Sequence, residues 1–351
     1  MAAPHAAVVG TSFGCRVHVP ALRAAGFEVV ALVGTDRERT ERRAARAGIA
    51  IATTDLGRVL NDVDAVTIAT PPQTHKLLVL AALRAGKHVI CEKPFTLGTT
   101  EARDLVAAAE RAGVTALVGH EFRWSPDRAV LGQAVRDGLI GEPRFATFVQ
   151  YVPLVADPET RMPRWWFDRG AGGGWLGASG SHLVDQVRVW LGEFSTVSAS
   201  LRVVSDREVS ADDSFTIRAR MNNGCDVVLQ QSAGAFGPLT GMTRVAGSAG
   251  TVWLDAGCTW LADAAGTREL PVPESLRLPE APPHSDDPGP ADTHLELGPY
   301  TRLCEVLRAG VEGRPHGSAV PVPTFGDGLL DMRVLDAIRA SAAAGGSRVS
   351  I

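Results

Sequence analysis

The chain has 351 residues, of which 45% are hydrophobic and 21% charged, a composition typical of a folded globular enzyme rather than of a disordered chain. Its length exceeds that of one ordinary core and predicts two domains. The net charge of −4, without any block of basic residues, argues against nucleic acid as a partner.

The five cysteines are odd in number and scattered, with no Cys-x-x-Cys pair. This pattern indicates reduced thiols rather than a disulfide framework or a zinc site, and we expect no metal. The N-terminal residues run directly into an apolar strand, so we expect no signal peptide, and no run of about 18 apolar residues predicts a membrane span. The cytoplasm is the expected location.

The chain begins with the order of elements that binds a dinucleotide. An apolar run at 6–9 ends in Gly10-Thr11-Ser12-Phe13-Gly14-Cys15, and a helix is predicted over 17–25. A glycine turn between a strand and a helix offers free backbone N–H groups to a phosphate. The glycine pattern is incomplete, because Ser12 and Cys15 stand where the second and third glycines would be, so this motif is weak when taken alone.

Strands and helices then alternate through the first third of the chain. Strands are predicted at 28–33, 65–69, 88–91 and 114–119, with helices at 40–47, 75–85 and 99–112. Alternation of this kind predicts a doubly wound parallel sheet with right-handed crossovers. The turns that follow three of these strands should share the carboxyl edge of the sheet, where ligands bind. We place this Rossmann domain at residues 1–122.

The second strand ends where an acid usually binds the adenosine ribose of NAD. Gly34 stands at that place, followed by Thr35, Asp36, Arg37 and Arg39. A missing carboxylate and nearby arginines favour NADP, since a carboxylate would repel the extra phosphate. Asp36 could still accept a ribose hydroxyl, so NAD stays open as the alternative.

The turn after the strand at 88–91 is Glu92-Lys93-Pro94. A lysine after a strand is most often an ordinary surface residue, but here Pro94 fixes the backbone and Glu92 can hold the ammonium in place. Together with Gly10-x-x-x-Gly14, Ala69-Thr70-Pro71-Pro72-x-x-His75 and Ala85-Gly86-Lys87-His88, this turn resembles the nucleotide domain of the Gfo/Idh/MocA family (glucose–fructose oxidoreductase, inositol 2-dehydrogenase and MocA). The resemblance implies that NADP or NAD is contacted by residues of these turns: Gly10, Ser12, Phe13, Gly14, Thr35, Asp36, Arg37, Thr70, Pro72, His75, Glu92 and Lys93.

A second domain is expected over 123–351. A strand at 144–152 leads to an aromatic and basic stretch, and then to Gly172-Gly173-Gly174 and a helix predicted over 181–191. Glycines let the backbone approach a ligand closely, and His182 and Asp185 lie one turn apart on that helix. The family has a similar triple glycine, then an aspartate, then Gly-x-His, but its usual aspartate falls on Ala178 here.

The rest of the second domain reads as β-structure, with strands at 197–204, 215–221, 226–233, 242–246 and 251–254. Consecutive strands without helices predict a mostly antiparallel sheet, the open-faced sheet that the resemblance implies. A broad apolar face is usually covered by self-association, so we expect a homodimer or homotetramer through this sheet. Residues 271–290 are predicted to lack regular structure, and helices are predicted at 300–309 and 326–343.

The resemblance implies an NAD(P)-dependent oxidoreductase that transfers a hydride to or from a secondary hydroxyl of a sugar, inositol or related cyclic polyol. By that resemblance, Lys93 binds the reacting oxygen, Glu92 orients Lys93, and His182 is the acid or base. We expect Asp185 or Ser179 to compensate for Ala178. The candidate substrate-binding residues are Lys93, His182, Arg123, Arg164, Trp165 and Trp166, although paired tryptophans are often simply buried.

Two other functions remain open at this point. One is a glycosidase that uses NAD for a transient oxidation followed by elimination. The other is a non-catalytic regulator that senses a nucleotide, since a fold alone does not fix a function. Retention of both Lys93 and His182 argues against the regulator.

Overall fold

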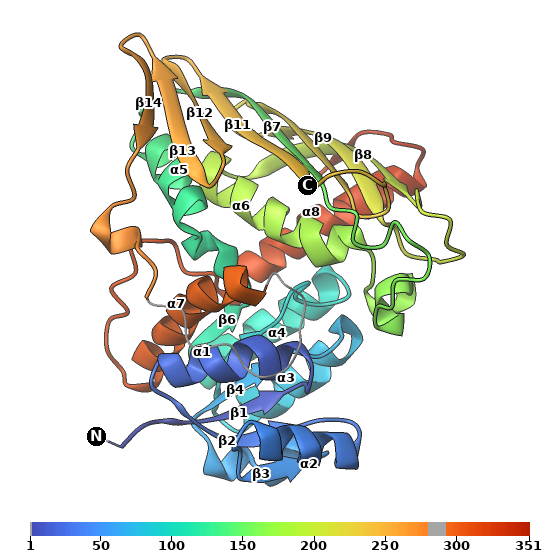
Figure 1. Ribbon diagram of the computed structural model, residues 1–351, viewed down its shortest axis with the longest axis vertical. Helices are drawn as coiled ribbons and strands as arrows, with labels where there is room; N and C mark the ends of the chain where they lie inside the picture. Colours follow the sequence, from blue (N-terminus) through green and yellow to red (C-terminus); the bar gives the residue numbers. More distant parts are fainter. Residues whose placement is uncertain (1, 280–292) are drawn as a thin grey trace. The chain divides into compact units, whose positions relative to one another are not determined.

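The computed structural model describes residues 2–279 and 293–351. The chain forms two compact units: unit 1 comprises Met1–Ser125 and Arg277–Leu329, and unit 2 comprises Pro126–Leu276 and Leu330–Ile351 (Figure 1). The sequence predicted a single boundary after residue 122. The chain first leaves unit 1 close to that position, but it returns there for residues 277–329, which had been placed in the second domain.

Unit 1 is built on a six-stranded sheet in the order β3-β2-β1-β4-β5-β6, in which every paired strand runs parallel. Its strands are β1 (His5–Val9), β2 (Glu28–Val33), β3 (Ile51–Thr53), β4 (Ala65–Ile68), β5 (His88–Cys91) and β6 (Ala116–Val118). The central strands are almost wholly buried and apolar, as expected for a parallel sheet between two layers of helices. The strand order reverses between β1 and β4, and in such sheets this reversal opens a ligand crevice at the carboxyl ends.

The helices of unit 1 come from both ends of the sequence. They are α1 (Val19–Ala24), α2 (Arg37–Arg46), α3 (His75–Arg84), α4 (Thr99–Ala112) and α7 (Thr293–Val311). In α4 the buried residues Ala102, Leu105 and Ala109 recur at helical spacing, and Gly113 ends the helix at φ +63°. The helix α3 packs against α4, whereas α1 packs against α7, which the chain supplies after completing most of unit 2.

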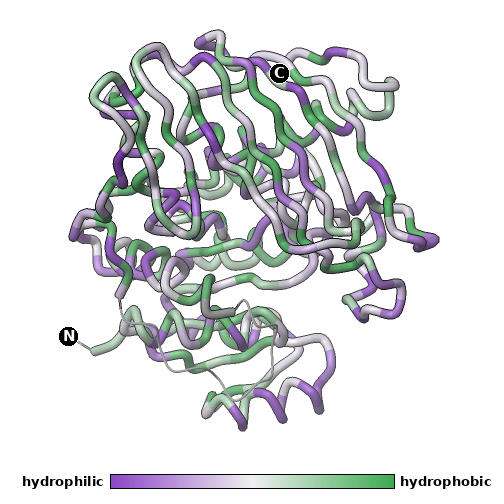
Figure 2. Tube along the Cα trace, turned by 45° about the horizontal axis from the view of Figure 1, so that its top comes forward, coloured by the Kyte–Doolittle hydropathy of each residue, from purple (hydrophilic) through white to green (hydrophobic). Residues whose placement is uncertain are grey.

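Unit 2 is built on a nine-stranded sheet in the order β14-β13-β12-β11-β7-β10-β9-β8-β15. Its strands are β7 (Pro143–Tyr151), β8 (Phe194–Arg202), β9 (Ser214–Met221), β10 (Asp226–Ser232), β11 (Thr240–Gly247), β12 (Gly250–Asp255), β13 (Cys258–Asp263), β14 (Gly266–Leu270) and β15 (Val349–Ser350). All pairs are antiparallel except β7 with β10. Burial alternates along β9 and β10, and Figure 2 shows hydrophobic and hydrophilic residues alternating along strands of this sheet.

One face of the large sheet carries the core of unit 2. Phe148, Leu229 and Ile217 lie side by side on β7, β10 and β9 and are buried. Helices α5 (Pro126–Arg136), α6 (Ser181–Leu191) and α8 (Phe325–Ala343) supply contacts on this side. Trp190 of α6 packs on Phe148 with ring centroids 5.7 Å apart, and Ala199 of β8 donates its N–H to Ser341 of α8.

The opposite face of the large sheet, called the outer face below, carries exposed apolar residues. Phe145 of β7 and Met242 of β11 are each 53% exposed. Trp253 and Trp260 pair across β12 and β13 with stacked rings 6.4 Å apart. Arg244 lies beside Trp253 in the register and places its guanidinium 5.5 Å from that ring.

The predicted elements agree with the structure where the pattern was long and regular. The predicted helices at 99–112 and 181–191 match α4 and α6 at both ends. The sequence reading missed the edge strands β3, β14 and β15, and it also missed the internal strand β13 and the helix α5. Residues 280–290 of the predicted irregular segment lie outside the described residues, and the part before them contains one short helical turn, Glu274–Leu276.

None of the helices in the described part of the chain is both long and apolar enough to cross a membrane.

Candidate active site

Three turns leave the carboxyl ends of β1, β4 and β5 at one edge of unit 1, as predicted. Gly10 follows β1 with φ +119°, and a Cβ atom there would lie 2.2 Å from the carbonyl oxygen of Ala69. A Cβ on Gly14 would lie 2.8 Å from a methyl carbon of Val8. Only glycine therefore fits at Gly10, and the first turn packs directly on the second.

A widened helical turn, Gly14–His18, follows Gly10. Val19 donates its N–H to the carbonyl of Gly14, five residues back. Pro20 accounts for this, because it has no N–H and its ring crowds the carbonyl four residues earlier. The N–H groups at the start of a helix have no partner within the helix, so Ser12 and Phe13 lie where a phosphate can be held. The turn also buries His18 completely.

The end of β2 has no room for the ribose-binding acid. A Cβ on Gly34 would lie 2.2 Å from the hydroxyl of Thr40 and 2.7 Å from the methyl group of Thr11. Asp36 caps α2 by accepting the N–H of Arg39 at 2.8 Å. The side chains of Thr35, Asp36, Arg37 and Arg39 are all exposed, and Arg37 pairs with Glu41 on its own helix.

His75 is fully buried and links two of the turns. Its Nε2 lies 2.8 Å from the carbonyl oxygen of Thr70, and its Nδ1 lies 3.1 Å from that of Phe95. Burial lowers the pKa of His75. The sequence analysis placed His75 among the residues that contact the cofactor, but a side chain with no exposed surface instead positions Thr70 and the turn that follows Lys93. Pro72 is also buried, whereas Thr70 is half-buried.

Glu92 lies at the end of β5, is only 6% exposed and has several partners in unit 1. Its Oε1 is 3.2 Å from Nε2 of His18, and its Oε2 accepts the backbone N–H of Lys93 at 3.2 Å. A Cβ on Gly119 would lie 2.5 Å from Oε1, so that glycine also bounds the carboxylate. Burial alone would raise the pKa of Glu92, but His18, Lys93 and Tyr300 outweigh it and lower the pKa.

Glu121 is a second buried carboxyl group of unit 1, and it has the opposite charge preference. It follows β6 in the short helical turn Glu121–Trp124 and is 1% exposed. Burial, together with the negative charges of Glu92 and Glu296, raises the pKa of Glu121 well above its usual value, although Lys93 opposes this. The pKa values of the two carboxyls are therefore shifted in opposite directions, that of Glu92 downward and that of Glu121 upward. Pairs of this kind are common in active sites.

Lys93 is half-buried at the same edge, and the Lys93–Pro94 peptide bond is cis. Its charge is one of the causes that lower the pKa of Glu92. Arg123, a predicted substrate-binding residue, is instead buried in unit 1. It pairs with Asp327 at 3.2 Å and donates to the carbonyl of Pro321, so it ties the returning segment to the end of β6.

In unit 2 the triple glycine approaches the protein itself. A Cβ on Gly173 would lie 2.1 Å from the carbonyl oxygen of Trp165, and one on Gly174 would lie 2.6 Å from a carboxylate oxygen of Asp212. Asp212 accepts the N–H of Leu176 at 2.8 Å, and burial raises its pKa. From the sequence, these glycines were attributed to close approach of a ligand. In the structure they let this turn pack against the aromatic loop, residues 161–168, and against the loop that contains Asp212.

The glycine turn leads into α6, which carries both predicted acid–base residues of unit 2. His182 and Asp185 are 7% and 1% exposed, one turn apart. Ala178, in place of the family's aspartate, lies in a widened turn just before α6. Arg188, one turn after Asp185, pairs with Asp331 of α8 and Glu193. Burial opposes the Arg188 charge, but these carboxylates outweigh it and raise its pKa, so α6 is firmly held in unit 2.

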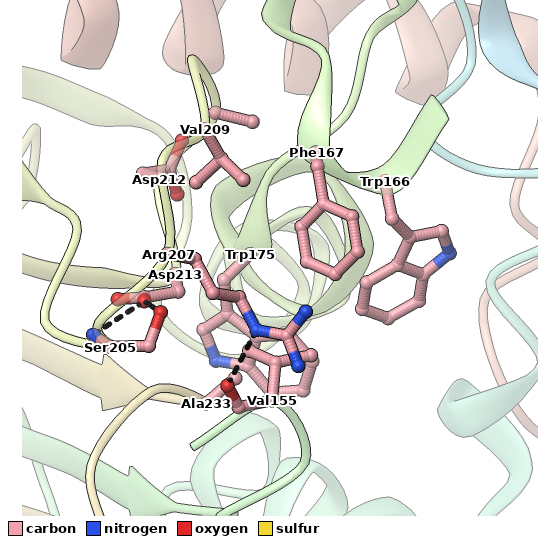
Figure 3. A pocket seen from close by; sticks show the side chains of 11 residues that line it. Val155, Trp166, Phe167, Trp175, Ser205, Arg207, Val209, Asp212, Asp213 and Ala233 are labelled. Carbon is pink, nitrogen blue, oxygen red and sulfur yellow. Dashed lines mark hydrogen bonds between the residues drawn. The ribbon is translucent and has the colours of Figure 1, made fainter. Parts of the chain in front are cut away.

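The aromatic loop forms one wall of a small pocket in unit 2 (Figure 3). The rings of Trp166 lie 5.9 Å from Trp165 and 6.1 Å from Trp175. Figure 3 shows Arg207 in this pocket; its guanidinium lies 4.9 Å from the centre of the Phe167 ring and donates to the carbonyl of Val155. Trp165 and Trp166 are half-buried, and Arg164 is exposed, so part of this loop is packed as the alternative interpretation expected.

Sequence reasoning missed three buried residues of unit 1, His18, Glu121 and Tyr300. It also missed the half-buried Asp212 of unit 2. No motif marked any of them. Each acts through contacts with residues far away in the sequence, so only the folded chain identifies them.

Two family descriptions match the chain. Residues 5–120 match "Oxidoreductase family, NAD-binding Rossmann fold", and residues 129–253 match "GFO/IDH/MocA C-terminal domain". These matches confirm the predicted pair of a Rossmann domain and a second domain with a mostly antiparallel sheet.

Several similar proteins are named for activities on sugars. The chain is 33% identical over 267 residues to D-apiose dehydrogenase of Paraburkholderia graminis, a match that covers 71% of this chain and 67% of that protein. It is 35% identical over 178 residues to 1,5-anhydro-D-fructose reductase of Ensifer adhaerens, covering 50% of this chain and 52% of that protein. A solved structure of levoglucosan dehydrogenase with NADH and levoglucosan covers 99% of both chains at a TM-score of 0.85 and 24% identity, which establishes the shared fold.

We predict that Gly173→Ala destabilises unit 2, because the new methyl group would overlap backbone oxygen that cannot move away cheaply. Overpacking of this kind costs about 1–3 kcal/mol. Urea unfolding should show a lower midpoint. The matched control is Gly241→Ala, whose nearest neighbour is 3.6 Å from the added carbon and whose midpoint should hardly change. Equal midpoints for the two variants would contradict the packing role of Gly173.

Proposed function

Because the chain belongs to the GFO/IDH/MocA family of oxidoreductases, with a NAD-binding Rossmann fold in its first part, we propose that it transfers a hydride between a nicotinamide cofactor and a secondary hydroxyl or carbonyl carbon of a sugar or related cyclic polyol. The observation that carries this proposal is the turn Glu92-Lys93-Pro94, which lies at the carboxyl edge of the parallel sheet with Glu92 buried and ionised behind Lys93.

The residues of unit 1 fit a dinucleotide. Gly10 brings backbone to the edge of the sheet without a side chain, and the helix after it begins at Phe13, beside the exposed Ser12. Such a helix start holds a pyrophosphate. A bound nicotinamide would supply the hydride acceptor in alcohol oxidation.

Oxidation of a secondary alcohol breaks one C–H bond and one O–H bond: the hydride leaves carbon, and the proton must be taken from oxygen. The ammonium group of Lys93 can donate a hydrogen bond to that oxygen and stabilise its growing negative charge. Glu92 keeps the charge of Lys93 in place. We propose that His182 accepts this proton, since a histidine with a pKa near neutral can serve as a general base. General base catalysis typically raises the rate by ~10²–10⁴-fold. Asp185 is the acid that we assign to the support of His182.

The substrate class follows from the relatives. D-Apiose dehydrogenase and 1,5-anhydro-D-fructose reductase are both named for sugars, and the solved neighbour holds levoglucosan. Trp165, Trp166 and Arg164 are our candidates for sugar contacts, because they are the exposed or half-buried members of the aromatic loop. Arg123 is not among them, since its side chain is 1% exposed and pairs with Asp327.

We favour NADP over NAD as the cofactor. No acid can stand at position 34, and Asp36 is engaged as the cap of α2. Arg37 and Arg39 are exposed at the start of the same helix and can approach a 2′-phosphate.

We also propose that the outer face of the large sheet is covered by a second copy of the chain, in a homodimer or homotetramer. Its exposed Phe145, Met242 and tryptophan pair form the kind of apolar surface that usually marks an association site. We place the protein in the cytoplasm, because all five cysteines are free thiols; alkylation of these thiols in freshly opened cells would test this.

The central prediction concerns Lys93 and His182. Lys93→Ala and His182→Ala should each lower kcat for sugar oxidation by about 100-fold or more, because charge stabilisation or proton transfer is lost. Reduction of NAD⁺ and NADP⁺ should be measured against a panel of sugars and cyclitols, with cofactor binding followed by fluorescence. Lys87→Ala, at the amino end of β5, is the matched control and should keep its activity.

Turnover at the wild-type rate in the Lys93→Ala variant would show that Lys93 takes no part in the reaction. A cofactor that stays bound without net turnover, while a glycoside is cleaved, would instead indicate the glycosidase.

The second prediction concerns the cofactor. Arg37→Ala combined with Arg39→Ala should raise KM for NADP⁺ by about tenfold, as loss of a hydrogen bond to a charged group would give. The KM for NAD⁺ should be little changed. Arg42→Ala, whose side chain pairs with Glu38 on the same helix, serves as the control. A parallel rise of both KM values would contradict a 2′-phosphate contact.

The third prediction concerns assembly. Phe145→Glu combined with Met242→Glu should lower the mass in analytical ultracentrifugation, because burying two carboxylates in an interface is costly. Leu77→Glu changes an equally apolar residue, 75% exposed on α3, and should leave the mass unaltered. A wild-type protein that sediments as a monomer would contradict the proposed self-association.

A further inference from the structure

The most constrained polar group that no motif marked is His18. It is 0% exposed and lies on the widened turn that Pro20 imposes. Its Nε2 is 3.2 Å from Oε1 of Glu92, 74 positions later in the sequence. Its ring stacks on Tyr300 of α7, with centroids 4.5 Å apart and planes 26° apart. One side chain therefore joins the first turn of unit 1, the end of β5 and the returning segment.

The hydrogen-bonding state of His18 follows from its two nitrogens. Nε2 faces a carboxylate, which can only accept, whereas Nδ1 has no hydrogen-bond partner among the described residues. A proton on Nε2 satisfies this arrangement, because it donates to Glu92 and leaves a lone pair rather than an N–H group on the buried side. Placing the proton on Nδ1 would bury an unmatched donor and turn two acceptors toward each other.

Other titratable groups face Glu92 from every element packed around it. Tyr300 lies on α7 and is fully buried; its hydroxyl is close enough to favour the ionised form of Glu92, although it makes no hydrogen bond of standard geometry with the described residues. The pKa of Glu121, from the turn after β6, is raised by burial and by the negative charge of Glu92. His75, from α3, has its pKa lowered by burial, and Lys93 is the cationic neighbour in the chain.

We propose that His18 is a positioning residue that, together with Tyr300, keeps the Glu92 carboxylate ionised and fixed in orientation beside Lys93, and thereby sets the lower pH limit of hydride transfer. The link between His18 and the pH limit of hydride transfer rests on the proposed function. The effect of His18 on the charge of Glu92 does not, and it holds for the protein without cofactor or substrate.

The effect of pH has a definite sign. In the wild type the pKa of Glu92 is lowered, so its ionised form stabilises the fold above the ordinary glutamate value and this stability is lost as pH falls through the lowered pKa. Without His18, the largest influence that lowers this pKa is lost while burial still raises it, so we expect the pKa of Glu92 to rise. Such a variant is destabilised at pH 8 and recovers relative to the wild type as pH falls toward 5, because the buried carboxyl then takes up a proton.

The test uses two substitutions that separate the donor from the ring. His18→Phe keeps an aromatic ring against Tyr300 but removes the N–H group, whereas His18→Gln keeps an N–H donor within similar reach of Glu92. Melting temperatures of the full chain, without ligands, should be measured from pH 5 to pH 8. His18→Phe should melt about 4–8 °C below the wild type at pH 8, with the gap at least halved at pH 5. His18→Gln should stay closer to the wild type throughout.

Two further variants secure the interpretation. In a Glu92→Gln background, His18→Phe should cause a melting difference that does not vary with pH, since no carboxyl remains to titrate. If His18→Phe does not fold, His18→Leu replaces it. A gap that is equal at pH 5 and pH 8, or a Gln variant as damaged as the Phe variant at pH 8, would overturn the proposal.

The measurement of activity against pH is independent of the measurement of melting temperatures. The acidic limb of the kcat/KM profile should move upward by about one pH unit in His18→Phe and stay in place in His18→Gln. A melting gap without this shift would overturn the link to the reaction. Absence of hydride transfer in the wild type would overturn the proposed function, while the melting series would still decide the role of His18.

Discussion

The buried carboxylate of Glu92 is the constraint on which the rest of unit 1 depends. Placing a charge at a 6% exposed position is unfavourable unless donors and a counter-charge surround it. The structure provides them from three places: the first turn through His18, the next residue through the backbone N–H and charge of Lys93, and the returning helix through Tyr300. The doubly wound topology brings these distant residues to one edge, so the fold and the charge of Glu92 support each other.

Unit 2 positions its histidine by different means. The helix α6 begins in a glycine turn that packs on backbone oxygens, and Asp212 accepts the N–H of Leu176 just before it. Farther along, Arg188 joins α6 to α8 through Asp331. A buried ion pair of this type adds little net stability, but it fixes one arrangement of two helices and so holds α6, with His182, in one position.

The sequence predicted the repetitive parts of the fold and the motif-bearing parts of the site. Periodicity located α4 and α6 to the residue, because long amphipathic patterns carry their own signal. Glu92, Lys93 and His182 were predicted as site residues because they lie near glycine or proline in a recognisable order. His18, Glu121 and Tyr300 could not be found this way, since their roles come from tertiary contacts between residues up to hundreds of positions apart. His75 and Arg123 were assigned to ligands because their burial was invisible in the sequence.

The return of residues 277–329 to unit 1 has a consequence for how the protein is made. A ribosome releases the whole parallel sheet within the first 118 residues, yet α7, with Tyr300, emerges only after all of β7 to β14. Until then α1 lacks the helix that packs on it, and His18 lacks the ring that stacks on it. The N-terminal part of unit 1 therefore cannot complete its folding as an independent unit during translation. The large sheet of unit 2 can form while unit 1 is still incomplete.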